Sequence, residues 1–86
     1  MTKKAISTDK APAAIGPYSQ AIEIGNLIFT SGVIPVVPAT GEIPSGVEAQ
    51  AEQAFANLTE LLKAADTSTE KTVKTTVFIK NMDDFG

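Results

Sequence analysis

The chain has 86 residues, with seven lysines, no arginine and ten carboxylates, and its net charge is −3 at pH 7. This length allows one domain at most. Because the hydrophobic core of so short a chain is small, we expect contacts with partner subunits to stabilise it. It contains neither cysteine nor histidine, which excludes disulfides, thiolate nucleophiles, the usual zinc sites and catalytic triads. It has no apolar run that could cross a membrane, no signal-peptide core and no basic block longer than Lys3-Lys4, so we expect a soluble cytoplasmic protein that binds neither membrane nor nucleic acid.

Three short strands are predicted in the first half of the chain. Residues 4–7 are typical of a brief edge strand before a loop. Residues 19–24 alternate between two faces, and residues 27–33 are rich in the β-branched and aromatic residues that suit a strand. Gly25-Asn26 lies between the last two strands, and we expect both of its residues to adopt positive φ in a tight hairpin.

A proline-rich loop over residues 35–44 is followed by a predicted helix. Ser45 and Glu48 have the spacing of a capping box, so we expect the Ser45 hydroxyl to accept a hydrogen bond from the Glu48 amide. Asp66 is expected to end the helix in a left-handed conformation, where glycine would be better tolerated. The apolar stripe that should face a sheet contains Val47, Ala51, Ala54, Phe55, Leu58, Leu61, Leu62 and Ala65, and the face towards water contains Glu52, Gln53, Asn57, Glu60 and Lys63.

Residues 73–80 alternate again and predict a fourth strand. A strand, a helix and a further strand form a right-handed β-α-β crossover with parallel strands. The whole chain, residues 1–86, is therefore predicted to be a single α+β domain, built from a β-hairpin and a crossover. Asn81 to Phe85 contains acidic helix-start residues with no helix sequence behind them.

Two short motifs indicate a family. The first is Gly16-Pro17-Tyr18-Ser19-Gln20-Ala21, which contains the only tyrosine of the chain, and the second is Ser31-Gly32 at the end of a strand. Taken alone, Tyr18 is typical of a packing residue and Ser31-Gly32 of a strand end. With Val73-Lys74-Thr75-Thr76-Val77 after the helix, however, the sequence closely resembles the Rid (reactive intermediate deaminase, or YjgF) family from Ile6 to Phe85.

The resemblance implies a chorismate-mutase-like (YjgF-like) half-barrel sheet packed on a helix, assembled as a homotrimer. It implies hydrolysis of small reactive 2-imino or 2-enamino acids, without cofactor or metal, and it makes Tyr18, Ser31 and Gly32 substrate-binding residues. The family's arginine that grips the substrate carboxylate, its water-ordering glutamate, its last helix and its last strands belong to a part that this sequence lacks. We therefore assign no catalytic residue and expect an incomplete Rid-like domain.

Several interpretations remain open. The first is a truncated deaminase that is weak or inactive by itself. The second is a non-catalytic trimeric module that binds a small ligand or supports assembly. A ribonuclease or translation inhibitor, as some Rid-like proteins are described, is a third, although the acidic charge and the lack of arginine argue against it. Lys74 could form a Schiff base, but a solvated lysine on the polar face of a strand is the favoured explanation.

Overall fold

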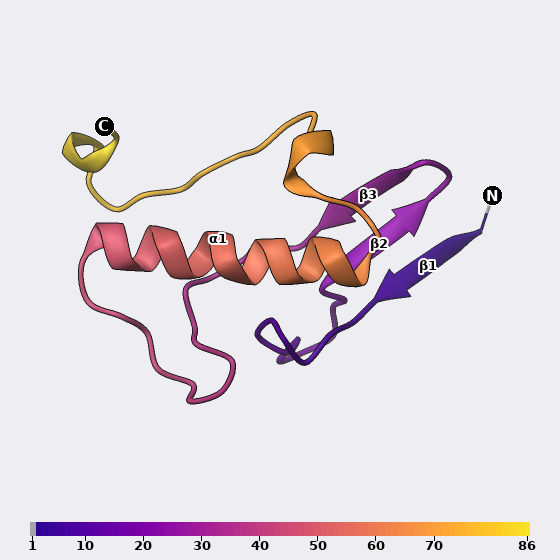
Figure 1. The fold of residues 1–86 in the computed structure, drawn as a ribbon, viewed down its shortest axis with the longest axis horizontal. Helices are drawn as coiled ribbons and strands as arrows, with labels where there is room; N and C mark the ends of the chain where they lie inside the picture. The colour runs from indigo at the N-terminus through magenta and orange to yellow at the C-terminus, as the bar shows by residue number, and fades with distance from the viewer. Residues whose placement is uncertain (1) are drawn as a thin grey trace.

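The computed structural model describes residues 2–86, which form a three-stranded sheet and one long helix. The elements in chain order are β1 (Lys3–Ile6), β2 (Ala21–Ile24), β3 (Leu27–Thr30) and α1 (Val47–Ala64), with 3-10 turns at Thr69–Lys71 and Met82–Asp84. The sheet order is β1-β2-β3, and both pairs of strands are antiparallel (Figure 1). The predicted α+β class and the three N-terminal strands are confirmed.

The hairpin between β2 and β3 has a two-residue loop, because Ile24 pairs with Leu27. Gly25 adopts a φ of 59°, whereas Asn26 is not among the described residues with positive φ. The prediction is therefore right for Gly25 and wrong for Asn26. A positive φ at the first loop residue alone is the pattern of a II′ turn, whose twist matches that of the flanking strands and which needs glycine only there.

The core lies between the sheet and the C-terminal half of α1. Its buried members are Ile6, Ala11, Ala21, Leu61 and Ala65, with Ile28 and Val33 packed against them. Figure 1 shows the strands beside the end of α1, while the beginning of the helix extends away from them. The apolar stripe is therefore covered at Leu61, Leu62 and Ala65, whereas Val47, Ala51 and Phe55 are exposed because no strand lies under them.

One residue of the predicted water-facing side of α1 is buried instead. Asn57 has only 1% of its surface exposed. It lies four residues before Leu61 and three after Ala54, so helical geometry puts it on the apolar stripe. Its amide is compatible with burial because every hydrogen-bonding group on it has a partner, as described below.

The predicted fourth strand is wrong as a paired strand. Residues 73–80 make no strand pairing, and all of them except Ile79 are exposed. The segment leaves the 3-10 turn after α1 as an extended trace (Figure 1). Alternation along a sequence favours an extended backbone, but a ladder also requires a neighbouring edge. None of the three described strands lies against this segment, so the β-α-β crossover does not form within residues 2–86.

The two predictions for the ends of α1 have opposite outcomes. The N-cap is Gly46, with a φ of 90°, and no side chain caps it, so the capping box at Ser45 is wrong. The helix starts one residue later than the box requires, which moves the Ser45 hydroxyl out of the capping position. At the other end Asp66 has a φ of 62°, which confirms the left-handed conformation.

Replacing Asp66 with glycine should raise the free energy of unfolding by up to about 1 kcal/mol, because the left-handed strain outweighs the added freedom of the unfolded chain. Urea unfolding followed by circular dichroism measures the change. The matched control is Asp9→Gly, at an exposed position without positive φ, which should destabilise the chain by a few tenths of a kcal/mol. Destabilisation by Asp66→Gly equal to that by Asp9→Gly would contradict the assignment of strain.

Candidate functional site

Tyr18 is carried by a tight turn at the entry to β2. Gly16 has a φ of 133°, a conformation that residues with a side chain rarely adopt, and the Tyr18 amide donates to the Gly16 carbonyl at 2.9 Å. Pro17 between them has a fixed φ. The turn leaves the Tyr18 side chain 52% exposed. Its ring is therefore accessible to a ligand.

An open cavity of about 290 Å³ lies beside Tyr18. Its walls come from the end of β1, the loop that follows and the residues leading into β2, and they include the hydroxyl-bearing residues Ser7, Thr8, Tyr18 and Ser19. No charged side chain lines it. The cavity can therefore offer hydrogen bonds to a small polar molecule, but it offers no counter-charge of its own.

Ser31 is joined to the Tyr18 segment through two hydrogen bonds. Its amide donates to the Gln20 carbonyl at 2.9 Å, and its hydroxyl donates to the Ser19 carbonyl. The end of β3 is thus held against the residue next to Tyr18. The two predicted binding positions are brought together, although Ser31 is not among the residues that line the cavity.

Gly32 follows at the exposed end of the same segment. A Cβ built at this position would meet no atom within 4 Å, and the φ of Gly32 is not in the left-handed region. Neither local packing nor backbone conformation within residues 2–86 therefore requires glycine here. Open space above the backbone is what the close approach of a ligand would need.

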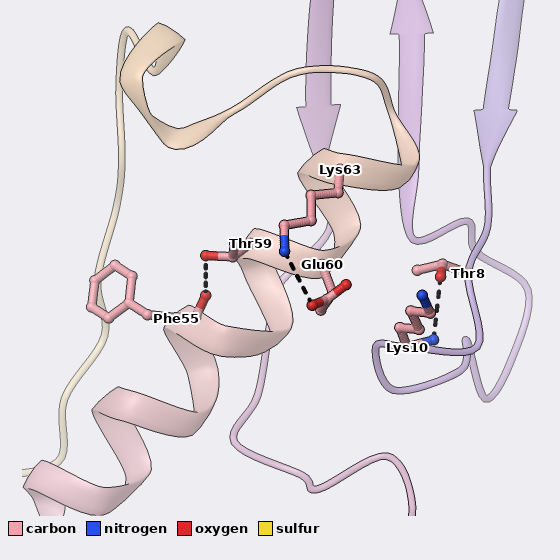
Figure 2. A network of polar contacts seen from close by, with 6 residues as sticks. All are labelled: Thr8, Lys10, Phe55, Thr59, Glu60 and Lys63. Carbon is pink, nitrogen blue, oxygen red and sulfur yellow. Dashed lines mark hydrogen bonds and ion pairs between the residues drawn. The ribbon is translucent and has the colours of Figure 1, made fainter.

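A second depression, of about 250 Å³, lies between α1 and the loop after β1. Figure 2 shows Lys63 and Glu60 paired along α1 at 3.5 Å, with Thr8 and Lys10 in the facing loop. The Lys10 contact drawn there is the backbone amide donating to the Thr8 hydroxyl at 3.2 Å. Glu60 neutralises Lys63, and the Lys63 side chain is largely and the Glu60 side chain partly exposed to solvent. This depression is therefore a weak candidate for anion binding.

The remaining sequence candidates do not assemble into a centre. Lys74 is exposed in the unpaired segment, as a solvated lysine would be. No group of three or more His, Cys, Asp or Glu residues in the described chain could hold a metal ion. Within residues 2–86, no helix has both the length and the apolar character needed to span a membrane.

Sequence reasoning missed two buried polar side chains, one lining the cavity beside Tyr18 and one bonded to the segment after Gly32. Gln20 and Asn57 are the buried polar residues of the described chain. The position of Asn57, three and four residues from apolar members of the stripe, was the available signal. Gln20 had no comparable signal, because it lies just before β2, where the alternation of a strand does not predict which side chains are buried.

The model of one protein family, described as Endoribonuclease L-PSP, matches residues 8–86. The chain belongs to this family, which is also called the Rid or YjgF family. A RutC family protein of Haemophilus influenzae is 52% identical over 85 residues, which cover 99% of this chain and 65% of the relative. The 2-iminobutanoate/2-iminopropanoate deaminase of Escherichia coli is 52% identical over 82 residues, which cover 95% of this chain and 64% of the relative.

The fold agrees with the family. The crystal structure of Escherichia coli TdcF with bound serine superimposes with a TM-score of 0.91 and 48% sequence identity, over 95% of this chain and 65% of that one. The YjgF-like fold expected from the resemblance is therefore confirmed for the part that this chain contains. The chain spans somewhat less than two thirds of the length of the curated relatives it matches.

Proposed function

We propose that this Rid-family chain contributes to the hydrolysis of reactive 2-imino and 2-enamino acids to 2-keto acids and ammonia. The observation that carries the proposal is its 52% identity to a 2-iminobutanoate/2-iminopropanoate deaminase. Two further observations support it: a relative of the same fold binds serine, a small amino acid, and the hydrogen bonds of Ser31 hold it against Ser19 and Gln20, which line the small cavity beside Tyr18.

The reaction needs no cofactor. A 2-enamino acid first gains a proton at C3 and loses one from its nitrogen, which gives the 2-imino acid. The oxygen of a water molecule then adds to C2 of the imine, the C=N bond becomes a C–N single bond, and the nitrogen leaves as ammonia while C2 becomes the ketone carbon. The water supplies the oxygen and, directly or through solvent, the two protons that the nitrogen gains. Holding the imine and polarising it with fixed dipoles is therefore the main task of the protein.

The geometry supports different roles for the three proposed binding residues. The Tyr18 hydroxyl can donate or accept and is free to turn towards a ligand. The Ser31 hydroxyl already donates its proton to the Ser19 carbonyl, so it offers lone pairs and is suited to accept from the substrate N–H. Gly32 leaves its backbone open to close approach.

No positively charged group of the described chain lines the cavity in which the substrate carboxylate would bind. There is no arginine in the sequence and no charged residue around the cavity beside Tyr18. A lysine would lack the planar fork that holds a carboxylate in two places. We therefore propose that residues 1–86 are by themselves a weak or inactive form, and that an arginine from outside this sequence completes the site.

The experiment is a coupled assay. A serine dehydratase generates 2-aminoacrylate, the chain is added, and the loss of the species trapped by semicarbazide is followed. We expect no measurable acceleration from the folded chain, since it lacks the carboxylate clamp. Rapid loss of the trapped species would show that the clamp is dispensable and would overturn the assignment of a weak form.

A non-catalytic trimeric module is the second candidate, and the sheet favours it. Ile22 and Phe29 are cross-strand partners, and because Ala21 faces α1 they lie on the opposite face of the sheet. Phe29 is 59% exposed and Leu27 48%. An apolar sheet face of this kind is typical of an interface between subunits, so we propose that copies of this chain associate through it.

Phe29→Glu should abolish that association, because a charge on the apolar face would have to be buried against a second copy. Light scattering measures the mass in solution. We expect a trimer for the unsubstituted chain and a monomer for Phe29→Glu. Val73→Glu adds the same charge at a residue that is 89% exposed and lies outside the sheet, and should leave the mass unchanged. A trimer that survives Phe29→Glu would place the interface elsewhere.

A further inference from the structure

Two buried side chains, Asn57 and Gln20, are amides, with 1% and 7% of their surfaces exposed. Burying an amide costs free energy unless its polar atoms find partners. Both amides are satisfied, and no buried side-chain nitrogen or oxygen among the described residues lacks a hydrogen bond. Their partners are almost all backbone groups of loops, so these amides hold loop backbone in place.

Asn57 reaches from α1 to the segment that follows Ser31-Gly32. Its Nδ2 donates to the Ile34 carbonyl at 2.9 Å and to the Val36 carbonyl at 2.8 Å. Its Oδ1 accepts from Gln53 Nε2 at 2.9 Å. The two protons of one amide therefore fix two carbonyls on either side of Pro35, a residue with no N–H of its own.

The Gln20 side chain holds the loop that precedes Tyr18 in the same way. Its Oε1 accepts from the Thr8 amide at 2.7 Å, and its Nε2 donates to the Pro12 carbonyl at 2.7 Å and to the Thr8 carbonyl at 3.1 Å. A longer contact, of 3.4 Å, reaches the Ala11 carbonyl. The loop that leads to Tyr18 is thus tied to the first residue before β2.

Along the chain, Ser31 lies between the two sets of bonds, three residues before Ile34. The Gln20 carbonyl accepts from the Ser31 amide, and the Ser19 carbonyl accepts from the Ser31 hydroxyl. On one side of this junction lies Tyr18, whose loop Gln20 holds, and on the other lies the segment held by Asn57. Movement of either loop would change the separation between the Tyr18 and Ser31 hydroxyls.

We propose that Asn57 and Gln20 are positioning residues of the ligand site: they touch no ligand themselves, but their amides set the two backbone segments that bring Tyr18 and Ser31 together. The proposal rests on the proposed function for its consequence in catalysis. Its geometric part stands independently, because the hydrogen bonds belong to the chain whatever its substrate.

The test compares the two sides of the Asn57 amide. Asn57→Asp keeps the acceptor for Gln53 and replaces Nδ2 with an oxygen, so it removes both donations to the loop. Gln53→Ala removes only the bond to Oδ1 and keeps both donations. In the 86-residue chain, amide hydrogen exchange is measured for Ser31 and Val37, whose amides donate to the Gln20 and Glu42 carbonyls.

We expect Asn57→Asp to accelerate exchange at Ser31 and Val37 by about tenfold or more relative to the Ala65 amide at the end of α1. Gln53→Ala should leave this ratio unchanged. Equal ratios in the two variants would overturn the proposal, since the donations would then not hold the loop. If Asn57→Asp does not fold, Gln20→Glu is used instead, because it keeps the acceptor for Thr8 and removes the donations to Pro12 and Thr8. We then expect faster exchange at Ser31 relative to Ala65, and an unchanged ratio would overturn the proposal.

A second readout separates this proposal from the proposed function. Residues 1–86 are joined to the C-terminal part of the Escherichia coli deaminase, and kcat and KM for 2-aminoacrylate are measured. We expect Asn57→Asp to lower kcat about tenfold while Gln53→Ala does not. An altered exchange ratio with unchanged kcat would overturn the positioning role, whereas a joined enzyme that is inactive without any substitution counts against the proposed function instead.

Discussion

Leu61→Ala is expected to lower the free energy of unfolding by about 2 to 5 kcal/mol. Leu61 is 2% exposed and lies in the buried cluster between α1 and the sheet. Because the other four buried members of that cluster are three alanines and one isoleucine of β1, little neighbouring apolar volume can move into the cavity. A domain of this size has about 5 to 10 kcal/mol of stability in total, so this one substitution should remove a large part of it.

Chemical unfolding followed by circular dichroism measures this loss. The matched control is Ile15→Ala, which removes apolar atoms from a side chain that is 91% exposed and should change stability by less than about 0.5 kcal/mol. If the two substitutions destabilised the chain equally, α1 would not pack on the sheet through Leu61, and the described core would be wrong.

Tyr18→Phe should strongly lower activity while preserving the fold. It removes one hydroxyl from a side chain that is 52% exposed, so stability should hardly change. In the enzyme made by joining residues 1–86 to the C-terminal part of the Escherichia coli deaminase, we expect kcat/KM to fall by about 100-fold, the scale for losing one hydrogen bond to developing charge.

Ser31→Ala should have a similar effect, and the two changes together should cost less than the product of the single effects, because Ser31 and Tyr18 are linked through Ser19. Ser45→Ala removes an exposed hydroxyl that caps nothing and serves as the control. Full activity after Tyr18→Phe and Ser31→Ala combined would remove both residues from the site.

Much of the fold could be predicted because it depends on local patterns. The hairpin at Gly25, the long helix and the left-handed Asp66 each follow from the conformational limits of a few neighbouring residues. The proximity of Tyr18 and Ser31 also follows from the sequence, since a two-residue hairpin must bring the start of β2 beside the end of β3.

What could not be predicted depends on partners elsewhere in space. Asn57 looks polar in a helical pattern, and its burial becomes favourable through the carbonyls of Ile34 and Val36, which lie far from it in the sequence, together with Gln53 on the same helix. Residues 73–80 have the alternation of a strand, but alternation cannot supply the neighbouring edge that pairing needs. For the same reason, the exposed part of the α1 stripe at Phe55 could not be separated in advance from the covered part.

We propose that this chain supplies part of a deaminase site that an external arginine completes. This proposal is tested most directly by comparing two rates of 2-aminoacrylate loss under semicarbazide trapping: that of residues 1–86 alone and that of the same residues joined to the C-terminal part of the Escherichia coli deaminase. We predict that the joined enzyme is faster by about 100-fold or more. If both proteins were folded and the joined enzyme were no faster than the chain alone, an arginine from outside residues 1–86 would not be what completes the site, and the proposal would be wrong.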